Sequence, residues 1–465
     1  MIKKLILLLC ITVSALAQEP KYYRYDTDIL SKDFHKGRRE ALREKMPANS
    51  TAVLFAAPER LYNNDNDYQY HQSPNFYYLT GFLEPNSMLI IFKSPQTLNG
   101  ITSDEFLFVQ DLNPDKEVWT GRRAGKNGAG EVTGIKGILL ASDFDSLEIA
   151  FEKFEKIWYS LPKGMIDNTS EQDDLFSLVE SFKKKCNYPP SNGDLRGLSS
   201  AMSELREIKQ PEEIELMRKV AHMSCDGHDE IMRALTPGMH EYDAAAIGEY
   251  VWKREGAEYV GYPSICGGAE NSCILHYESN RRTLHAGDVQ LNDMAAEYHG
   301  YSADVTRTVP VNGKFSPEQK EIYELVLKAQ QAGFESCIAG NEFRAPHKAA
   351  VDVISKGLMD LGITKSEDDY KKYFIHSTSH YLGLDVHDPG TYGPLKPGAI
   401  LTVEPGIYIP EGSPCDPKWW NIGVRIEDDI LITDRGYENL SASSPRTVEA
   451  IEALMKEKPV WIKEK

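Results

Sequence analysis

A chain of 465 residues with 70 acidic and 52 basic side chains carries a formal net charge of −18. A protein this acidic is a poor partner for nucleic acid or for anionic membranes, because phosphates call for Lys and Arg. The length fits two or three domains, and a 41% hydrophobic content is enough to give each domain a full core.

The first 17 residues have the pattern of a signal peptide. Lys3 and Lys4 form a positive start, 5–17 is apolar, and an Ala-Leu-Ala cleavage signal precedes Gln18. The apolar run is too short to span a bilayer, and no other segment has the necessary length. We therefore expect an exported protein, periplasmic or secreted, without a membrane span; the alternative for this segment is a buried N-terminal helix.

The N-terminal half alternates helical and strand-like segments, which is typical of an α/β domain. The expected helices cover 33–46, 145–158 and 171–186, and the expected strands cover 51–57, 87–92 and 104–111. A stretch rich in Pro, Gly, Ser and Asn at 187–199 is the expected linker. We therefore expect an N-terminal domain over 18–199 and a second domain over 200–465.

The C-terminal half begins with a long amphipathic helix. Gln210 and Pro211, followed by two glutamates, are a helix start, and apolar residues recur on one face to about Ala234. Further helices are expected near 241–254, 317–340 and 345–361. Strands that carry acidic residues lie between these helices, so the chain as a whole is expected to be of the α/β (α+β) class.

Two aspartates in this half are expected to meet across a hairpin. Asp293 and Asp304 are 11 residues apart, an odd separation that would place them on opposite faces of one continuous strand. Two strands, 289–297 and 301–309, remove the conflict. If the turn centres just before His299, the two aspartates lie directly opposite, whereas a turn shifted by one residue leaves them diagonal neighbours.

Two glutamates repeat this arrangement. The midpoint between Glu404 and Glu427 falls within the loop-like stretch 410–421. Strands that flank this loop would therefore bring the two glutamates together on one face.

A metal site is one explanation of these carboxylates, and solvated surface residues are the alternative. Acidic residues are normally exposed. Asp293 in VQLNDMAA and Glu404 in ILTVEPGIYI, however, are embedded in apolar runs, where a carboxylate is seldom buried unless it is paired or binds metal. His380, in HSTSHYLGLDVHDPG, adds an imidazole to the four carboxylates. This donor set suits a pair of hard divalent cations, which activate a water, so the sequence predicts a metallohydrolase.

Long motifs in a fixed order resemble those of proline-specific metallopeptidases of the pita-bread fold. The motifs are SPNFYYLTGFLEP (73–85), VWTGRRAG (118–125), GGAENSCILHY (267–277), DMAAEYHGYSADVTRT (293–308), HSTSHYLGLDVHD (376–388), VEPGIYIP (403–410) and GVRIEDD (423–429). Within this group the chain is most similar to the Xaa-Pro aminopeptidase (aminopeptidase P) family, with prolidase as a near neighbour. The resemblance covers almost all of the chain after the leader. It implies an N-terminal α/β domain followed by a C-terminal pita-bread metallopeptidase domain.

The resemblance implies a dinuclear metal site. Its five ligands would be Asp293, Asp304, His380, Glu404 and Glu427. By the same resemblance Asp304 and Glu427 bridge the two ions. Asp293 then binds one ion, and His380 with Glu404 binds the other. The expected ions are Mn²⁺, with Zn²⁺ or Co²⁺ as alternatives.

Four residues are implied to take part in catalysis. His276 resembles a histidine that assists proton transfer, and His387 resembles one that hydrogen-bonds the substrate near the scissile bond. Arg425 resembles an arginine that supports the carboxylates, and Glu404 would take and pass the proton. His376 matches a supporting position beside the ligands.

The implied reaction is release of the N-terminal residue from peptides that have proline in the second position. Proline-containing peptides are therefore the expected partners. Met294, directly after Asp293, is a prolidase-like feature, so an Xaa-Pro dipeptidase is the alternative. A non-catalytic peptide-binding relative would lack metal ligands, whereas all five are present here.

An aromatic residue in the N-terminal half bears on assembly. Trp119 matches a residue that in aminopeptidase P reaches the active site of a neighbouring subunit, although a tryptophan is by default a core residue. Members of the family are commonly dimers or tetramers. The resemblance therefore implies a homo-oligomer.

Overall fold

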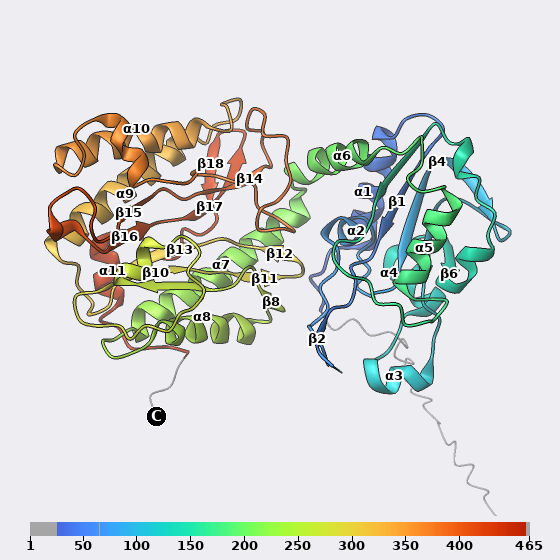
Figure 1. Cartoon of the computed structure of the whole chain (residues 1–465), viewed down its shortest axis with the longest axis horizontal. Helices are drawn as coiled ribbons and strands as arrows, with labels where there is room; N and C mark the ends of the chain where they lie inside the picture. The colour runs from blue at the N-terminus through green and yellow to red at the C-terminus, as the bar shows by residue number, and fades with distance from the viewer. Residues whose placement is uncertain (1–25, 65, 462–465) are drawn as a thin grey trace, which may run out of the picture. The chain divides into compact units, whose positions relative to one another are not determined.

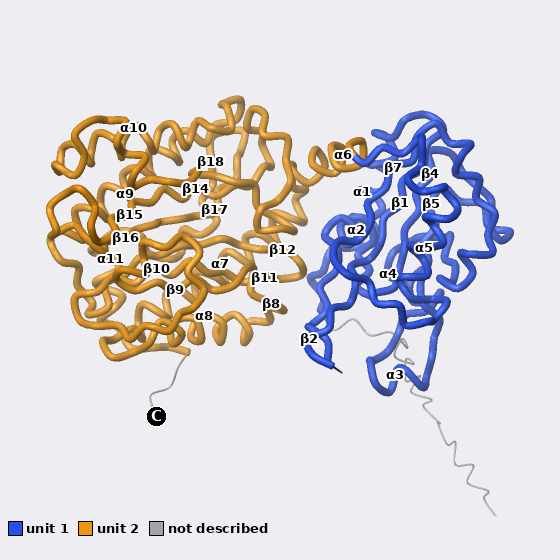
Figure 2. The backbone as a smooth tube through the Cα atoms, viewed as in Figure 1, with its two compact units in different colours: residues 1–195 blue, residues 196–465 orange. Residues whose placement is uncertain are grey.

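The computed structural model describes residues 26–461 except residue 65. The chain divides into two compact units, Met1–Leu195 and Arg196–Lys465 (Figure 2). The expected leader, 1–17, lies outside the described residues. Over the part of the chain that is described, no helix combines the length and the apolar composition that crossing a membrane requires.

A five-stranded mixed sheet forms the centre of the first unit (Figure 1). Its strands are β1 (Ser50–Phe55), β4 (Met88–Leu98), β5 (Ile101–Val109), β6 (Gly137–Leu140) and β7 (Lys156–Ser160), and a separate pair is β2 (Leu61–Asn63) with β3 (Asn66–Asp67). The order is β6-β5-β4-β1-β7, with antiparallel pairs in the middle and a parallel strand at each edge. Every residue of β1 is buried, as expected for an apolar strand covered on both faces. The three strands expected from the sequence are confirmed in β1, β4 and β5.

The helices of the first unit confirm two of the three expected segments. The elements are α1 (Lys32–Lys45), α2 (Pro74–Thr80), α3 (Pro114–Thr120), α4 (Gly125–Thr133) and α5 (Leu175–Lys185), with short 3₁₀ turns η1 (Ala141–Ser146) and η2 (Phe151–Lys153). The helix expected over 145–158 is wrong. Its second half enters the edge strand β7 and pairs with β1, because the aromatic and β-branched run Ile157-Trp158-Tyr159 is buried there.

The second unit confirms the four long helices that the sequence predicts, which are α7 (Pro211–Ala234), α8 (Glu241–Glu255), α9 (Pro317–Glu335) and α10 (Ala345–Asp360). It also contains the helices α6 (Leu195–Glu207) and α11 (Val448–Leu454), which were not expected, and the 3₁₀ turns η3 (Ala269–Cys273), η4 (Glu367–Lys372) and η5 (Pro417–Trp419). At the start of α7 the side chain of Glu213 accepts from the backbone N–H of Gln210, 2.8 Å away, which completes a capping box. Helix α6 begins at Leu195, so the end of the stretch expected to be a linker is helical.

Short strands fill the space between these helices. They are β8 (Tyr259–Val260), β9 (Ile265–Gly268), β10 (Val289–Asp293), β11 (Ala296–Tyr298), β12 (Tyr301–Ser302), β13 (Thr306–Pro310), β14 (Ile400–Val403), β15 (Gly406–Ile409), β16 (Ile422–Arg425), β17 (Asp428–Thr433) and β18 (Gly436–Asn439). β10 pairs with β13 and β11 with β12, which makes one long hairpin with a break in each strand. β14 pairs with β17 and β15 with β16, which makes a second interrupted hairpin.

The turn of the first hairpin decides between the two expected registers. His299 and Gly300 have φ angles of 50° and 82°, the left-handed values that a type I′ turn requires at both central residues. The turn therefore centres one residue later than direct pairing needs, and Asp293 stands opposite Thr306. Of the two arrangements expected from the sequence, the structure has the one with the shifted turn, and the two aspartates are not directly opposite. In this register Asp304 is instead a diagonal neighbour of Asp293.

The second hairpin confirms the expected glutamate pair. Val403 lies opposite Asp428 at the end of one ladder, and the ladder beyond the break keeps the same register. Glu404 and Glu427 therefore occupy matching positions in that break.

Helices cover the outer side of each hairpin (Figure 1). Helices α7 and α8 pack on the strands of the first hairpin, and α9 packs on β14, β15 and β16 with α10 beside it. The two hairpins meet at an isolated bridge, in which the N–H of Glu427 donates to the carbonyl of Thr306 over 3.1 Å. The interrupted strands thus bring their acidic residues toward one another between two helical layers.

Candidate metal centre

Four of the five predicted ligands lie at strand ends or breaks of the second unit. Asp293 ends β10, Asp304 precedes β13, Glu404 follows β14, and Glu427 precedes β17. His380 lies beside β14, where its carbonyl accepts from the N–H of Thr402 over 3.0 Å. The three residues Asp293, Asp304 and Glu427 are buried, and His380 and Glu404 are half-buried.

The side chains of these residues converge. His380 Nε2 lies 3.3 Å from Asp304 Oδ2 and 3.7 Å from Glu404 Oε1. One ligand atom each from Asp304, His380 and Glu427 lie within 4.8 Å of one another. The structure therefore brings together an imidazole and two carboxylates that lie between 47 and 123 residues apart in the sequence.

Asp293 joins the group through a tyrosine that the sequence did not single out. The hydroxyl of Tyr262 lies 2.6 Å from Asp293 Oδ1 and 2.5 Å from Asp304 Oδ1. A phenol has one proton to donate, so the two aspartates share a single donor. Tyr262 is fixed between the two strands that carry the aspartates, and no local motif signals this position.

Electrostatics at the centre favour a bound cation. Burial raises the pKa of Glu404 to about 7, and the charge of Asp304 adds to the rise. Burial, followed by the charges of Asp304 and Glu404, raises the pKa of Glu427 far above its usual value. Burial alone would lower the pKa of His380, but its hydrogen bond to Asp304 raises it to about 9. Four carboxylates confined in this way repel one another, and their oxygens with one imidazole are a donor set that fits hard divalent cations.

Arg425 supports the carboxylates, as the resemblance implies. Its Nη2 donates to Asp293 Oδ2, and its Nη1 donates to the hydroxyl of Tyr408 over 2.8 Å. His376 Nε2 lies 2.8 Å from the same hydroxyl, and burial lowers the pKa of His376 to about 4. His376 is therefore neutral at pH 7, and its Nδ1 lies 3.6 Å from Glu404 Oε2. This places His376 beside the ligands, where a supporting role was expected.

The other two predicted catalytic histidines lie at the edge of the centre. The ring of His387 stacks on that of His380, with centroids 4.0 Å apart and planes 18° apart. Burial lowers the pKa of His387, and the charges of His380 and His276 lower it further. His276 follows η3 and its side chain is exposed. His387 is thus in direct contact with a predicted ligand, and His276 is near enough to His387 to affect its pKa.

The segment that carries His387 is held by a buried ion cluster. Asp388 accepts from Arg206 Nη2 at one oxygen and from Lys209 Nζ, 2.9 Å away, at the other. Arg206 Nη2 also donates to Asp385 Oδ2 over 2.7 Å. Arg206, Lys209 and Asp388 are all buried. Because Arg206 lies on helix α6 and Lys209 lies two residues after the end of that helix, the cluster ties the His387 segment to the start of the second unit.

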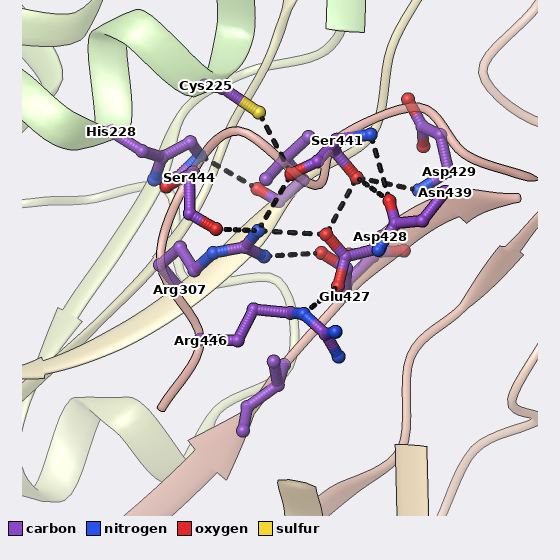
Figure 3. Close-up of polar contacts among 12 residues, drawn as sticks. Cys225, His228, Arg307, Glu427, Asp428, Asp429, Asn439, Ser441, Ser444 and Arg446 are labelled. Atoms are coloured by element: carbon purple, nitrogen blue, oxygen red, sulfur yellow. Dashed lines mark hydrogen bonds and ion pairs between the residues drawn. The ribbon is translucent and has the colours of Figure 1, made fainter. Parts of the chain in front are cut away.

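A second buried cluster supports Glu427 from behind (Figure 3). Arg307 Nη1 donates to the carbonyl of Glu427 over 2.7 Å, and its Nη2 donates to Asp428 Oδ1 over 2.8 Å. Asp428 also accepts from the hydroxyl of Ser441 over 2.7 Å. On the ligand side, Thr306 donates its hydroxyl to Glu427 Oε2 over 2.7 Å. Arg307 and Asp428 lie in the motifs quoted above, and their charges inside apolar runs were the signal that could have found them.

Trp119 lies in α3 of the first unit, and 87% of its surface is exposed. A core role within its own unit is therefore wrong. A tryptophan this exposed is uncommon in a surface that contacts only solvent.

Comparisons with known proteins agree with this architecture. Residues 215–434 match metallopeptidase family M24, and residues 35–156 match the aminopeptidase P N-terminal domain. The Xaa-Pro aminopeptidase of Escherichia coli (strain K12) is 37% identical over 442 residues, which cover 92% of this chain and 98% of that protein.

Solved structures of similar proteins have the same fold. Aminopeptidase P from Escherichia coli with the inhibitor Pro-Leu matches with a TM-score of 0.83 and 35% identity, over 92% of this chain and 99% of that one. A zinc-substituted form of the Escherichia coli enzyme in complex with product matches with a TM-score of 0.83 and 34% identity, over the same 92% and 99%. The expected fold class and the resemblance are both confirmed. The chain therefore belongs to metallopeptidase family M24, as a member that carries the aminopeptidase P N-terminal domain.

Proposed function

We propose that this chain is a dinuclear metal-dependent Xaa-Pro aminopeptidase, which releases the N-terminal residue from peptides with proline in the second position. The observation that carries the proposal is the convergence of Asp304, His380 and Glu427 within 4.8 Å, with Asp293 and Glu404 joined to them through Tyr262 and His380. The Xaa-Pro aminopeptidase relative spans nearly the whole chain, which supports the same reaction.

The five converging residues would hold two divalent cations, for which we propose Mn²⁺. Carboxylate oxygens suit Mn²⁺, and one imidazole is compatible with Mn²⁺, Zn²⁺ or Co²⁺. When bound, the ions supply an activated water and polarise the scissile carbonyl. Asp304 and Glu427, which lie with His380 within 4.8 Å, would be among the residues that hold these ions.

The remaining polar groups have assigned tasks in this proposal. Glu404 takes the proton of the attacking water and passes it on toward the leaving nitrogen. His387 hydrogen-bonds the substrate beside the scissile bond, and His276 assists proton transfer from the exposed side. Arg425 orients Asp293 through its hydrogen bond and offsets the repulsion among the carboxylates.

The substrate preference follows from proline chemistry. The nitrogen of an Xaa-Pro bond is a tertiary amide without N–H, so a peptidase that requires this hydrogen bond cannot use it. Recognition must instead come from a pocket that accepts the ring and from groups that bind the free amino terminus. We propose that the amino terminus lies near Asp293.

Three peptides test the proposal. The protein with added Mn²⁺ is incubated with an Xaa-Pro-Yaa tripeptide, an Xaa-Pro dipeptide and an Xaa-Ala-Yaa tripeptide, and release of the first residue is measured. Cleavage of the Xaa-Pro-Yaa peptide alone, lost with a chelator and regained with Mn²⁺, is the expected result. Cleavage of the dipeptide alone would make the chain a prolidase. Lack of cleavage of all three, with metal shown to be bound, would overturn the proposal.

A matched pair of variants strengthens the test. Glu404→Gln removes the proposed proton acceptor while keeping its shape, and Glu411→Gln changes an exposed glutamate in the adjoining loop. The first variant should lose activity, and the second should retain it. Repeating the assay with Zn²⁺ and Co²⁺ tests the choice of Mn²⁺.

We also propose that the chain assembles as a homo-oligomer through a surface that includes Trp119. The 87% exposure of this side chain supports the proposal. Sedimentation of the wild type and of Trp119→Ala tests it. A smaller species for the variant is expected, and a monomeric wild type would contradict it.

Export is a further proposal, which rests on residues 1–17. The expected mature N-terminus is Gln18. Mass spectrometry of the protein from its native source tests this, and an N-terminus at Met1 in a cytosolic fraction would contradict it.

A further inference from the structure

A buried histidine joins the two strands that carry the aspartates. His228 lies on α7, behind the first hairpin, and 1% of its surface is exposed. Its Nε2 lies 2.9 Å from the carbonyl oxygen of Met294 and 3.0 Å from that of Val305. Carbonyl oxygens only accept, so Nε2 carries a hydrogen that is shared between the strands. Met294 and Val305 are the residues that directly follow Asp293 and Asp304.

A buried glutamine likewise joins the two strands that carry the glutamates. Gln330 lies on α9, behind the second hairpin, and its surface is fully buried. Its Nε2 lies 3.2 Å from the carbonyl oxygen of Val403 and 3.1 Å from that of Ile426. These residues directly precede Glu404 and Glu427.

The orientation of the Gln330 amide is determined by its neighbours. Arg446 Nη1 donates to Gln330 Oε1 over 2.8 Å, while Gln330 Nε2 donates to Asp428 Oδ2 over 2.8 Å. The guanidinium can only donate, and a carboxylate oxygen can accept. The amide nitrogen therefore faces the two carbonyl oxygens and cannot rotate away without breaking these contacts.

The two contacts are alike in that each joins the two strands next to a pair of proposed ligands. Each hairpin has a break where its ligands lie, and each break is bridged from the helix behind it by one uncharged N–H group. We propose that His228 and Gln330 are positioning residues that set the separation of the carboxylates within each pair, His228 for Asp293 with Asp304 and Gln330 for Glu404 with Glu427. This inference rests on the metal-ligand assignment of the proposed function.

Repulsion between the carboxylates explains why the contacts of His228 and Gln330 are needed. Like charges in a buried site push their strands apart whenever cations are missing. Within the breaks the strands are joined by long backbone hydrogen bonds, from the N–H of Met294 to the carbonyl of Val305 over 3.2 Å and from the N–H of Ile426 to the carbonyl of Pro405 over 3.4 Å. A donor that bonds both strands keeps the backbone at the separation that the cations require. Burial lowers the pKa of His228 to about 4, so its ring is neutral and adds no charge to the site.

The alternative is that both side chains only satisfy buried carbonyl groups and thereby stabilise the fold. An unpaired buried polar group costs about 1–3 kcal/mol, so both explanations predict less stable variants. They differ in what happens to the folded protein. Only positioning residues change how the folded protein binds metal.

Binding of Co²⁺ to the metal-free full chain separates the two explanations. Affinity is measured by calorimetry, and coordination geometry is followed by visible absorption, so neither readout depends on catalysis. His228→Gln places an amide nitrogen where Nε2 lies, while His228→Asn is too short to reach both carbonyls. Gln330→Met keeps the shape of the side chain and removes its donor. The matched controls are His222→Asn, on the exposed side of α7, and Gln331→Met, exposed on α9.

His228→Asn and Gln330→Met should weaken Co²⁺ binding about tenfold or more and alter the visible spectrum. His228→Gln should restore most of the affinity, and both controls should match the wild type. Wild-type affinity and spectrum in His228→Asn and Gln330→Met, even with a lower Tm, would overturn the inference. A wild-type chain that binds no Co²⁺ would instead overturn the ligand assignment itself.

If the substituted chains do not fold, a measurement on the wild-type protein tests the inference. The ¹⁵N shifts of the His228 imidazole should show a neutral ring with its hydrogen on Nε2, protected from exchange. A ring that carries its hydrogen on Nδ1 would overturn the His228 contact.

Discussion

His387 and His380 lie in parallel, with ring centroids 4.0 Å apart and planes 18° apart. His387→Phe preserves this contact between flat rings and removes both nitrogens. Loss of a group that hydrogen-bonds the substrate or moves a proton should lower kcat/KM for an Xaa-Pro-Yaa peptide about 100-fold or more. Metal content should stay at the wild-type value, because His387 is not one of the proposed ligands.

The exposed His285, changed to Phe in the same way, is the control for this substitution. Loss of one metal ion from His387→Phe would contradict the assignment and make His387 a ligand.

Glu427 stands among carboxylates in the metal-free protein. Burial and the neighbouring carboxylates raise the pKa of Glu427 far above its usual value, which costs stability at neutral pH. Glu427→Gln removes this cost, so the metal-free variant should be more stable than the metal-free wild type at neutral pH. The same substitution removes a proposed bridging ligand. Added Mn²⁺ should stabilise the wild type by about 2.7 kcal/mol at a hundred times its Kd and should give the variant little or nothing.

Thermal unfolding with a chelator and with Mn²⁺ measures both effects. Equal gains in Tm from Mn²⁺ in wild type and variant would mean that Glu427 does not bind metal.

Asp388 forms ion pairs with the buried side chains of Arg206 and Lys209. These ion pairs are expected to affect both the stability of the protein and the position of His387. Asp388→Asn leaves Arg206 and Lys209 buried without a full counter-charge, which should lower the free energy of unfolding by about 3–5 kcal/mol. Burial alone would raise the pKa of Asp388, but the charges of Arg206 and Lys209 lower it. Its contribution is therefore present above its unfolded pKa of about 3.9 and is lost as the pH falls through the folded value.

Urea unfolding of wild type and Asp388→Asn at several pH values checks this. The difference in the free energy of unfolding between wild type and variant should be constant at neutral pH and should become smaller in acid. Asp385→Asn is the matched control, since that carboxylate is 47% exposed and its pair with Arg206 should contribute at most about 1 kcal/mol.

Glu213 should make the catalytic unit less stable as the pH rises. Burial raises its pKa from 4.5 to about 7, although the N–H of Gln210 and the hydroxyl of Tyr301 both donate to it. The folded chain thus binds this proton more tightly than the unfolded chain, so stability falls as the pH rises from 4.5 to about 7. Glu213→Gln should abolish this slope and stabilise the protein above pH 7 by about 3 kcal/mol.

Urea unfolding midpoints measured at acid and alkaline pH show how the stability changes with pH. The exposed neighbour Glu212, changed to Gln, should leave it unaltered. A wild-type slope in Glu213→Gln would assign the pH dependence to other groups.

The paired arrangement of the acidic strands could be predicted from the sequence, but its details could not. The register of Glu404 and Glu427 was expected because strand alternation and the position of the loop leave little freedom. The aspartate pair was displaced by one residue, because His299 accepts a left-handed conformation and moves the turn. That choice depends on how the hairpin packs, which alternation does not report.

The helix expected over 145–158 failed for a related reason. Its residues have helical periodicity, but Lys156–Ser160 lies beside β1, where pairing and burial outweigh local propensity.

By itself the sequence determined the residue types of the candidate metal centre, the two-domain order and the two acidic hairpins, because residue chemistry and periodicity act over short distances. Only the tertiary structure decided which side chains hold those ligands in place. His228 contacts a carbonyl 66 residues away, Gln330 one 73 residues away, and Arg206 a carboxylate 182 residues away. Such contacts are selected by packing in three dimensions, where a buried donor must find an acceptor wherever the fold has placed one.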